Sequence, residues 1–448
     1  MSNPESILKL PMSDFERVLD FQRKIYQKAK QEKEYRFYVL YDKMKLPHFL
    51  REAYKICKEN KGSAGVDNIT FEEIEESGVE GFLKGIAREL SEFTYKPEAV
   101  LRVNIPKSNG KTRPLGIPTI KDRVIQMAVK LVIEPIFEAD FEESSYGFRP
   151  SRSAHDAVEE IKKKLQKGKA EIFDADLSAY FDTIPHNELM LLVSKRVSDK
   201  HILQLIKMWL KASVYENKRY TGGKKNKIGT PQGGVISPLL ANIYLHLIDR
   251  VVNKASGIFR KYGVEIVRYA DDFVLMGSKI PEEVINYLKG LLNRMKLKIN
   301  EEKSRMVNGY KESFNFLGFT FRYSQDIHGR EKKYWNITPS EKSQKKVREN
   351  IRKYLRNNGY KEPELIAREL SAIIRGWINY FSIEKVSYPA MAKRKLRYYL
   401  YRKLNRFYKR KSQRKCKLYS NGALDYLMEC YGLIDVCKYN SNGATVKA

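Results

Sequence analysis

Apolar residues in the middle of the chain fall into short runs that are interrupted by polar junctions. Residues 266–267 and 273–276 form two such runs, and the tetrad Tyr269-Ala270-Asp271-Asp272 stands between them. Short β-rich runs on both sides of a polar junction are typical of two paired strands. The pattern therefore predicts a β-hairpin with two adjacent carboxylates at its tip.

Other segments of the chain also show periodic patterns. The residues from Glu171 to Asp176 predict a strand, and apolar runs on both sides of Ser108-Asn109-Gly110 predict a hairpin between about 105 and 118. A helix is predicted by apolar residues that recur at helical spacing, namely Val284, Leu288, Leu291 and Met295. Strands and helices thus alternate from about 166 to 330, which indicates an α+β core.

Beyond about residue 335 the pattern changes to basic helices. Between Lys393 and Lys417 there are thirteen Lys and Arg residues and no acidic residue. Such a stretch repels itself unless phosphates neutralise its charge. Because the chain has no internal repeat and no low-complexity tract, its division into parts rests on these changes of pattern.

Composition narrows the class of protein. The 448 residues are 42% hydrophobic, which is enough for a globular chain with a sizeable core and excludes a disordered protein. Lys and Arg number 84 against 54 Asp and Glu, and the net charge is +30. A charge of this size points to a polyanionic partner, and nucleic acid is the first candidate.

Cysteines and apolar segments indicate where the protein works. The four cysteines form no CxxC pair and have no histidine nearby, so neither a disulfide framework nor a zinc site is expected. The first residues lack the features of a signal peptide, and about 18 apolar residues never run uninterrupted. We expect a cytoplasmic protein of bacterial type that is associated with nucleic acid and has no membrane partner.

The Asp271-Asp272 pair is the first candidate for chemistry. Carboxylate oxygens are the hard ligands that Mg²⁺ prefers, and two ions about 3.5–4 Å apart can stabilise both the attacking and the leaving oxygen of a phosphoryl displacement. A third carboxylate on another strand would complete such a site. The alternative is a solvated turn, since Asp is common in turns.

The residues that follow the strand ending at Asp176 resemble the first palm motif of reverse transcriptases. In that motif an Asp is followed five positions later by an aromatic residue and often then by another Asp, as in Asp176, Phe181 and Asp182. The tetrad at Tyr269 resembles the second palm motif. The resemblance implies that Asp176, Asp271 and Asp272 are catalytic and bind two Mg²⁺ ions, for which Mn²⁺ can substitute.

Further segments resemble the reverse transcriptases encoded by group II introns, in that family's order and over roughly residues 35 to 415. The chain lacks the paired cysteines and late histidines of the C-terminal endonuclease that many relatives carry, so we expect the endonuclease-lacking type. The segments that carry the resemblance are 61–67, 145–152, 229–242, 316–319 and 375–381.

The resemblance implies a right-hand polymerase fold of the α+β class. It has fingers, a palm with an RRM-like sheet, and a helical, basic thumb called domain X. The expected parts are a basic N-terminal extension (1–48), fingers (49–165), a palm (166–330) with a helical insertion around 187–215, a thumb (331–413) and a short tail that is a candidate DNA-binding appendage (414–448).

The resemblance also implies a binding site for the incoming dNTP. Lys107 and Arg113 would hold the triphosphate, for which an ammonium and a fork-shaped guanidinium are suited. Phe181 would lie beneath the sugar, where its bulk excludes a 2′-hydroxyl. Gln232 would pack against the nucleotide, because Gly233 next to it allows a close backbone approach.

Two groups of residues are expected to hold nucleic acid. Phe316, Leu317 and Gly318 resemble the primer grip, an apolar hairpin that supports the growing 3′ end. The expected contacts of the thumb with RNA and DNA come from Arg375, Lys393, Arg397, Arg402 and Arg406. Their spacing could cover one side of a helix.

These features predict an RNA-directed DNA polymerase that uses an RNA template, a DNA primer and dNTPs. If a group II intron encodes it, the protein would also bind the intron RNA as a ribonucleoprotein, promote splicing as a maturase and act on target DNA in retrohoming. One alternative is a host-adopted enzyme of the same fold in antiviral defence, CRISPR spacer acquisition or DNA repair. Another is a splicing cofactor that binds RNA without catalysis.

Overall fold

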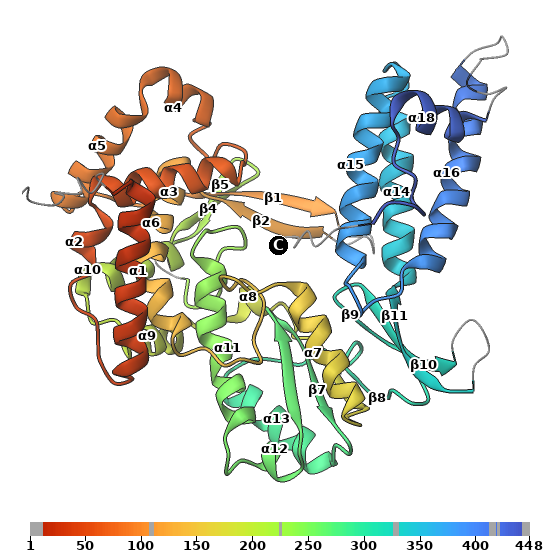
Figure 1. Cartoon of the computed structure of the whole chain (residues 1–448). Helices are drawn as coiled ribbons and strands as arrows, with labels where there is room; N and C mark the ends of the chain where they lie inside the picture. The colour runs from red at the N-terminus through yellow and green to blue at the C-terminus, as the bar shows by residue number, and fades with distance from the viewer. Residues whose placement is uncertain are drawn as a thin grey trace, which may run out of the picture.

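The structure is a computed structural model that describes residues 12–106, 112–223, 226–325, 331–411, 418 and 422–440. Figure 1 shows a helical region formed by the N-terminal part of the chain, a central sheet below it, and a helical bundle on the other side. Strands and helices occur together in the central part, so the predicted α+β class is confirmed.

The N-terminal region is built around one buried helix. Helix α6 (Ile120–Glu138) buries residues on every side, because nearly all of its positions are apolar or hydrogen-bonded. Helix α1 begins with a capping box between Ser13 and Glu16 and packs against α6 and α3. The surrounding helices are α1 (Asp14–Gln31), α2 (Tyr41–Met44), α3 (Pro47–Glu59), α4 (Phe71–Ser77) and α5 (Val79–Ser91).

A sheet with the strand order β2-β1-β4-β5 extends from this region. Strands β1 (Val100–Pro106) and β2 (Thr112–Ile117) pair antiparallel, with Pro106 opposite Thr112, as the sequence predicted for a hairpin here. The other two strands of the sheet, β4 (Ser213–Glu216) and β5 (Arg219–Gly222), come from a later part of the chain. Helices α9 (His186–Ser194) and α10 (Lys200–Leu210) precede them, where a helical insertion was expected.

The central sheet has the order β6-β7-β3-β8 and is antiparallel throughout. Successive residues of a strand point to opposite faces, and here both faces are covered. Phe173 and Phe273 join the core that contains helices α11 and α13, whereas Ile172 and Val274 join the core that contains helix α7. The elements are β3 (Glu171–Ala175), β6 (Glu265–Tyr269), β7 (Asp272–Gly277), β8 (Arg305–Asn308), α7 (Ala154–Gln166), α11 (Ser237–Asn253), α12 (Ile258–Lys261) and α13 (Glu282–Arg294).

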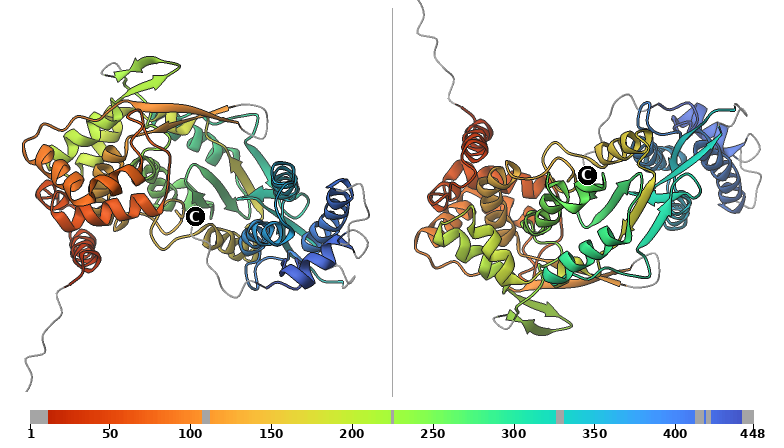
Figure 2. Two further views of the ribbon diagram at one scale, coloured as in Figure 1. Left: turned by 90° about the horizontal axis from the view of Figure 1, so that it is seen from above. Right: turned by 90° about the horizontal axis from the view of Figure 1, so that it is seen from below.

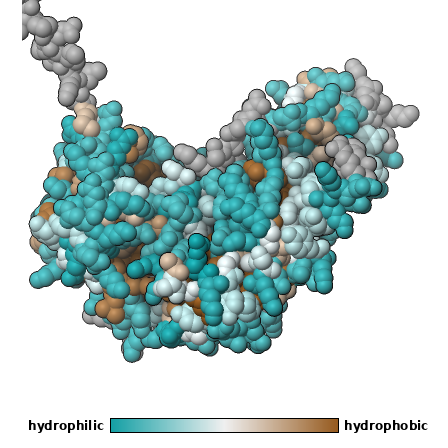
Figure 3. Space-filling view, turned by 60° about the horizontal axis from the view of Figure 1, so that its bottom comes forward, coloured by the Kyte–Doolittle hydropathy of each residue, from teal (hydrophilic) through white to brown (hydrophobic). Residues whose placement is uncertain are grey.

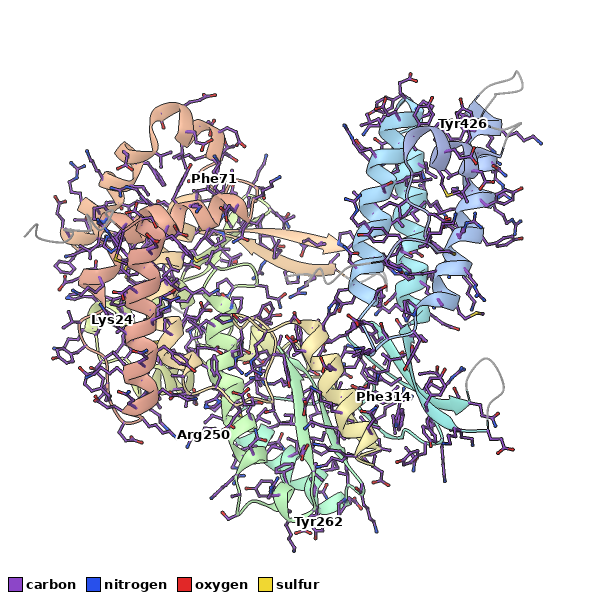
Figure 4. All side chains as sticks on the ribbon, viewed as in Figure 1. Lys24, Phe71, Arg250, Tyr262, Phe314 and Tyr426 are labelled. Atoms are coloured by element: carbon purple, nitrogen blue, oxygen red, sulfur yellow. The ribbon has the colours of Figure 1, made fainter. Side chains whose placement is uncertain are left out.

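A small sheet and a helical bundle follow. The sheet has the order β11-β10-β9, and its aromatic face shares a core with α7 and the bundle, while Asn315, Thr320 and Arg322 lie on its other face. Figure 4 places Phe314 at this junction between the central sheet and the bundle. The elements are β9 (Phe314–Phe316), β10 (Phe319–Gln325), β11 (Lys333–Pro339), α14 (Glu341–Asn357), α15 (Pro363–Phe381), α16 (Ala390–Lys411) and α18 (Ala423–Tyr431).

The bundle and the N-terminal region face each other across the hairpin β1-β2, as the two further views in Figure 2 also show. The face drawn in Figure 3 is mostly hydrophilic, with small and scattered apolar patches. Within the described part of the chain, none of the helices combines the length and the apolar character that crossing a bilayer requires.

Candidate active site

The predicted hairpin with a carboxylate tip is present. Strands β6 and β7 pair antiparallel up to Tyr269 and Asp272, which are opposite each other. Ala270 and Asp271 therefore form the turn, and Ala270 has a left-handed backbone with φ of 56°. A two-residue turn of this kind aims the side chains of Asp271 and Asp272 from the end of a rigid ladder.

Asp176 lies beside this hairpin because β3 is the neighbour of β7. Ala175 is opposite Phe273 in the antiparallel register, so the next residue, Asp176, is opposite Asp272. The backbone nitrogen of Asp176 donates to Oγ of Ser304 at 3.0 Å. The carboxylates that the sequence predicted as a triad thus come from the ends of the two inner strands of the sheet and from the turn between β6 and β7.

The electrostatics indicate that the three carboxylates are close together. Burial raises the pKa of Asp272 to about 6, and the charges of Asp271, Asp176 and Asp174 add to the rise. Burial also raises the pKa of Asp271, an effect that Arg113 opposes and Asp176 increases. Like charges held this close need a compensating cation.

Lys303 supplies one positive charge at this point. Its Nζ lies 3.1 Å from Oδ2 of Asp176, and its charge lowers the pKa of Asp272. In the described ranges, we find no group of three or more His, Cys, Asp or Glu side chains whose present positions could hold a metal ion. The donor set itself, three carboxylates from adjacent strand ends, has the chemistry that a hard divalent cation requires.

Asp174 is a fourth carboxylate near the triad. It is opposite Val274 on one side and Arg305 on the other. Burial raises its pKa to about 6, Arg305 opposes this rise and Asp176 adds to it. Asp174 is not among the metal ligands that the resemblance implies.

Three of the residues expected to bind the dNTP line one pocket of about 520 Å³, namely Arg113, Phe181 and Gln232. Nε of Arg113 donates to Oε1 of Gln232 at 2.7 Å, and Nε2 of Gln232 donates to Oδ2 of Asp182 at 3.3 Å. Phe181 is 8% exposed, with its ring on the pocket wall. Lys107, the fourth residue, lies outside the described residues.

The loop before α11 also meets the hairpin β1-β2 through its backbone. The nitrogen of Gly116 donates to the carbonyl of Gln232 at 2.5 Å. Gly233 has a φ of 113°, and a Cβ atom there would collide with the carbonyl oxygen of Gly116. Only glycine fits both the conformation and the space, so this contact sets the place of Gln232.

The residues of the expected primer grip form the tight turn between β9 and β10. Leu317 and Gly318 have left-handed backbones with φ of 48° and 82°. Tyr380 and Ser343 hold the turn, because their hydroxyl groups donate to the carbonyls of Leu317 and Gly318, each at 2.9 Å. Phe316, Leu317 and Gly318 all line a groove of about 1580 Å³ between the small sheet and the helical bundle.

The five basic residues expected to contact nucleic acid do not share one surface. Arg375 is exposed on α15, and Arg402 and Arg406 are exposed on α16. Lys393 is 8% exposed, and its Nζ donates to the carbonyl of Tyr439 at 2.9 Å. Its ammonium is therefore turned inward, against the expectation that it contacts nucleic acid.

Arg397 has acidic neighbours within the protein, and its contact with nucleic acid stays a prediction. Its guanidinium lies 3.6 Å from Asp435 and 3.7 Å from Asp425, so it faces acidic groups of the bundle. Charge spacing alone did not show which side of α16 packs against α14 and α18.

The sequence analysis missed one buried group beside the hairpin. Arg268 is wholly buried and pairs with Asp249 of α11, with Nη2 and Oδ2 2.5 Å apart. A charged residue inside the apolar run of β6 was the signal that could have found it, because such a residue needs a buried partner.

Comparisons with known proteins agree with this geometry. Residues 105–321 match the family model "Reverse transcriptase (RNA-dependent DNA polymerase)". Residues 344–422 match the family model "Group II intron, maturase-specific domain".

Two relatives show the extent of the similarity. Protein YkfC of Escherichia coli K12 is 34% identical over 363 residues, which cover 73% of this chain and 93% of that protein. The group II intron-encoded protein LtrA of Lactococcus lactis is 37% identical over 277 residues, which cover 61% of this chain. The match spans 43% of the length of LtrA, so less than half of that relative is covered.

Among solved structures, a partial Cas6-RT-Cas1–Cas2 complex matches with a TM-score of 0.35 and 23% sequence identity. The match covers 57% of this chain and 42% of that one.

Proposed function

Because the chain belongs to the reverse transcriptases, the family of RNA-dependent DNA polymerases, and carries the maturase-specific domain of group II intron proteins, we propose that it extends a primer along an RNA template at Asp176, Asp271 and Asp272. Its α+β fold is the right-hand polymerase fold of that family. The observation that carries the proposal is the register of β3 and β7, which sets Asp176 opposite Asp272 and beside the turn that holds Asp271.

The proposed cofactor is a pair of divalent cations, Mg²⁺ or in its place Mn²⁺, held by the three carboxylates. When bound, such ions lower the pKa of the primer 3′-hydroxyl and neutralise charge on the triphosphate. Lys303 balances part of the carboxylate charge through its ion pair with Asp176. Its ammonium would leave Asp176 when cations balance that charge instead. The side chains of the site then position the primer end and the triphosphate and exclude other arrangements of the two.

The pocket beside the hairpin is the proposed dNTP site. Arg113 lines this pocket, and its charge opposes the rise that burial causes in the pKa of Asp271. A triphosphate held there would receive two hydrogen bonds from the planar guanidinium. Phe181 forms the wall on which a 2′-hydroxyl would collide, and Lys107 stays a prediction as a second phosphate ligand.

The groove between the small sheet and the bundle is the proposed path of the primer end. It begins at the turn 316–318, and most of the charged residues along it are basic, namely Arg322, Lys332, Lys342, Lys346 and Lys395, with Glu341 among them. A mostly positive groove suits the phosphate backbone of a duplex.

A second basic surface supports a maturase role. Lys403 lies among Arg352, Arg356, Arg406 and Arg410, whose charges, together with burial, lower its pKa. None of these five cations forms an ion pair within the described residues. Five uncompensated cations on α14 and α16 favour a bound polyphosphate, and we infer that structured RNA such as a parent intron binds here.

Primer extension on an RNA template tests the polymerase proposal. The wild-type protein should incorporate dNTPs in the presence of Mg²⁺, and Asp271→Asn should lose this activity while it keeps its affinity for RNA. A matched control is Asp140→Asn, which removes a carboxylate of the N-terminal region. Substantial synthesis by Asp271→Asn would refute the assignment of the carboxylates, and binding without synthesis by the wild-type protein would favour an RNA-binding cofactor.

A further inference from the structure

The backbone of Gly147 packs directly against the turn that carries Asp271. A Cβ atom at position 147 would collide with the backbone nitrogen of Ala270 and the carbonyl carbon of Tyr269. The nitrogen of Tyr146 also donates to the carbonyl of Arg268 at 2.9 Å. A side chain at position 147 would therefore push the turn out of its place.

Arg268 holds the same turn from the side. Its Nη1 donates to the carbonyl oxygen of Ala270 at 2.9 Å. Ala270 has the left-handed backbone that L-residues with a Cβ rarely adopt, and such a conformation persists only where the surroundings enforce it. The hydrogen bond from Arg268 fixes the peptide that leads directly into Asp271.

Within the described residues, the carboxylate that balances the charge of Arg268 is that of Asp249. Nε of Arg268 donates to Oδ1 of Asp249 at 2.9 Å, and both side chains are 0% exposed. A buried ion pair of this kind is weak evidence for stability, because well-packed apolar residues often serve as well. Its presence beside the proposed catalytic carboxylates needs another explanation.

Asn242 joins the two supports of the turn. Its Oδ1 accepts from Nη1 of Arg268, and its Nδ2 donates to the carbonyl of Gly147, both at 2.8 Å. The side chain is 1% exposed, so no solvent can replace these bonds. Asn242 and Asp249 both lie on α11, which therefore ties the turn to the longest helix that packs on β6.

We propose that Arg268, Asp249 and Asn242 are positioning residues that fix the Ala270 peptide and thereby the direction of the Asp271 carboxylate. The inference rests on the proposed function of Asp271 as a catalytic ligand. Reacting groups must be held within about 0.5 Å of their productive places, and a displacement of about 1 Å can cost about a hundredfold in rate. All three side chains are buried, so they act through the turn.

The test uses the full chain with Asn242→Ala, which keeps the ion pair and the bond from Arg268 to Ala270. We expect kcat for primer extension to fall about tenfold or more, while KM for dNTP changes by less than about twofold. Binding of Mn²⁺ to the protein alone, followed by electron paramagnetic resonance, should weaken about tenfold. Arg268→Lys keeps the charge but cannot reach Asp249, Asn242 and Ala270 together, so it should change the same quantities in the same direction.

The matched control breaks a partly buried ion pair outside this network. Nε of Arg196 lies 2.9 Å from Asp140, and Asp140→Asn should lower the melting temperature without changing kcat or Mn²⁺ affinity per folded molecule. If Asn242→Ala behaves like this control, the network is only structural and the inference is wrong. Failure of the proposed function is a different result, since Asp271→Asn would then keep its full rate of synthesis.

Discussion

Nε of Arg113 donates a 2.7 Å hydrogen bond to Oε1 of Gln232, although 119 positions separate the two residues. The bond joins the hairpin β1-β2 to the loop before α11, across the mouth of the proposed nucleotide pocket. It holds the guanidinium before a substrate arrives, which reduces the entropy that binding costs.

Gln232→Ala should therefore weaken dNTP binding. Without its partner Arg113 samples other rotamers, and we expect KM for dNTP to rise about fivefold to tenfold, the size of one ordinary hydrogen bond. Steady-state primer extension with varied dNTP measures this. Asn104→Ala is the control, since Asn104 lies on the same hairpin but bonds to Glu216; equal effects of both variants would contradict the role of Gln232.

Phe181→Val should relax the choice of sugar. The smaller side chain leaves room for a 2′-hydroxyl on the pocket wall, so the ratio of ribonucleotide to deoxyribonucleotide incorporation should rise at least about tenfold. Competition assays on one template give the ratio. Tyr180→Phe serves as the control, because Tyr180 is adjacent and buried but its hydroxyl donates to the carbonyl of Ala241. An unchanged ratio in Phe181→Val would make Phe181 a core residue only.

The raised pKa of Asp272 predicts a pH dependence of stability. The folded protein has a pKa of about 6 for this group against the ordinary aspartate value of 3.8, so between these values the folded state binds the proton more tightly. The corresponding stability is present below pH 3.8 and is lost as the pH rises through 6. Metal-free wild-type protein should therefore lose more stability between about pH 4 and about pH 6 than Asp272→Asn does.

Melting curves of both proteins at a series of pH values measure this difference. Asp272 is exposed at the start of β7, so solvent screening should keep the effect modest. Mg²⁺ should reverse it, because a cation binds the ionised form and its affinity rises with pH. Parallel curves for the two proteins at all pH values would mean that Asp272 titrates normally.

The cation cluster on α14 and α16 predicts a loss of RNA binding. Arg352→Gln with Lys403→Gln and Arg406→Gln should weaken binding to structured RNA and reduce the slope of log K against log salt by about 2 to 3. Filter binding at several salt concentrations gives both quantities. Extension of a short primer and template should stay near the wild-type rate, which separates this surface from the active site.

A variant with the same change in net charge provides the control. Lys24→Gln, Lys28→Gln and Lys163→Gln remove three cations that are already paired with Asp20, Glu32 and Glu159. These substitutions should leave the salt slope nearly unchanged. A similar loss in both triple variants would mean that total charge, rather than this cluster, governs RNA binding.

The features that the sequence predicted correctly are local ones. Apolar runs around Asp271 and Asp272 define a hairpin, and a strand ends just before Asp176. Both could be predicted because strands and turns depend on the residue types of a few neighbouring positions. The helix expected from Val284 to Met295 is α13, which runs from Glu282 to Arg294.

The features that the sequence did not predict depend on packing between distant segments. Lys393 turns inward because Tyr439 offers a carbonyl beside it, and Arg397 faces Asp435, neither of which the spacing of charges on α16 reveals. The partners of Arg268 likewise come from another helix. Which charge meets which partner is decided by tertiary contacts, so a single sequence leaves it open.

In the strand order β6-β7-β3-β8, the inner strands β7 and β3 each have a paired strand on both sides. Asp272 begins β7, and Asp176 directly follows β3. Strands that are paired along both edges are among the last to open when a protein fluctuates, so their amide protons should exchange with solvent most slowly. Surface loops and the outer helices can then drift in sequence or loosen with temperature while the reaction centre keeps its shape. This hierarchy of opening would let one catalytic framework tolerate new recognition surfaces around it.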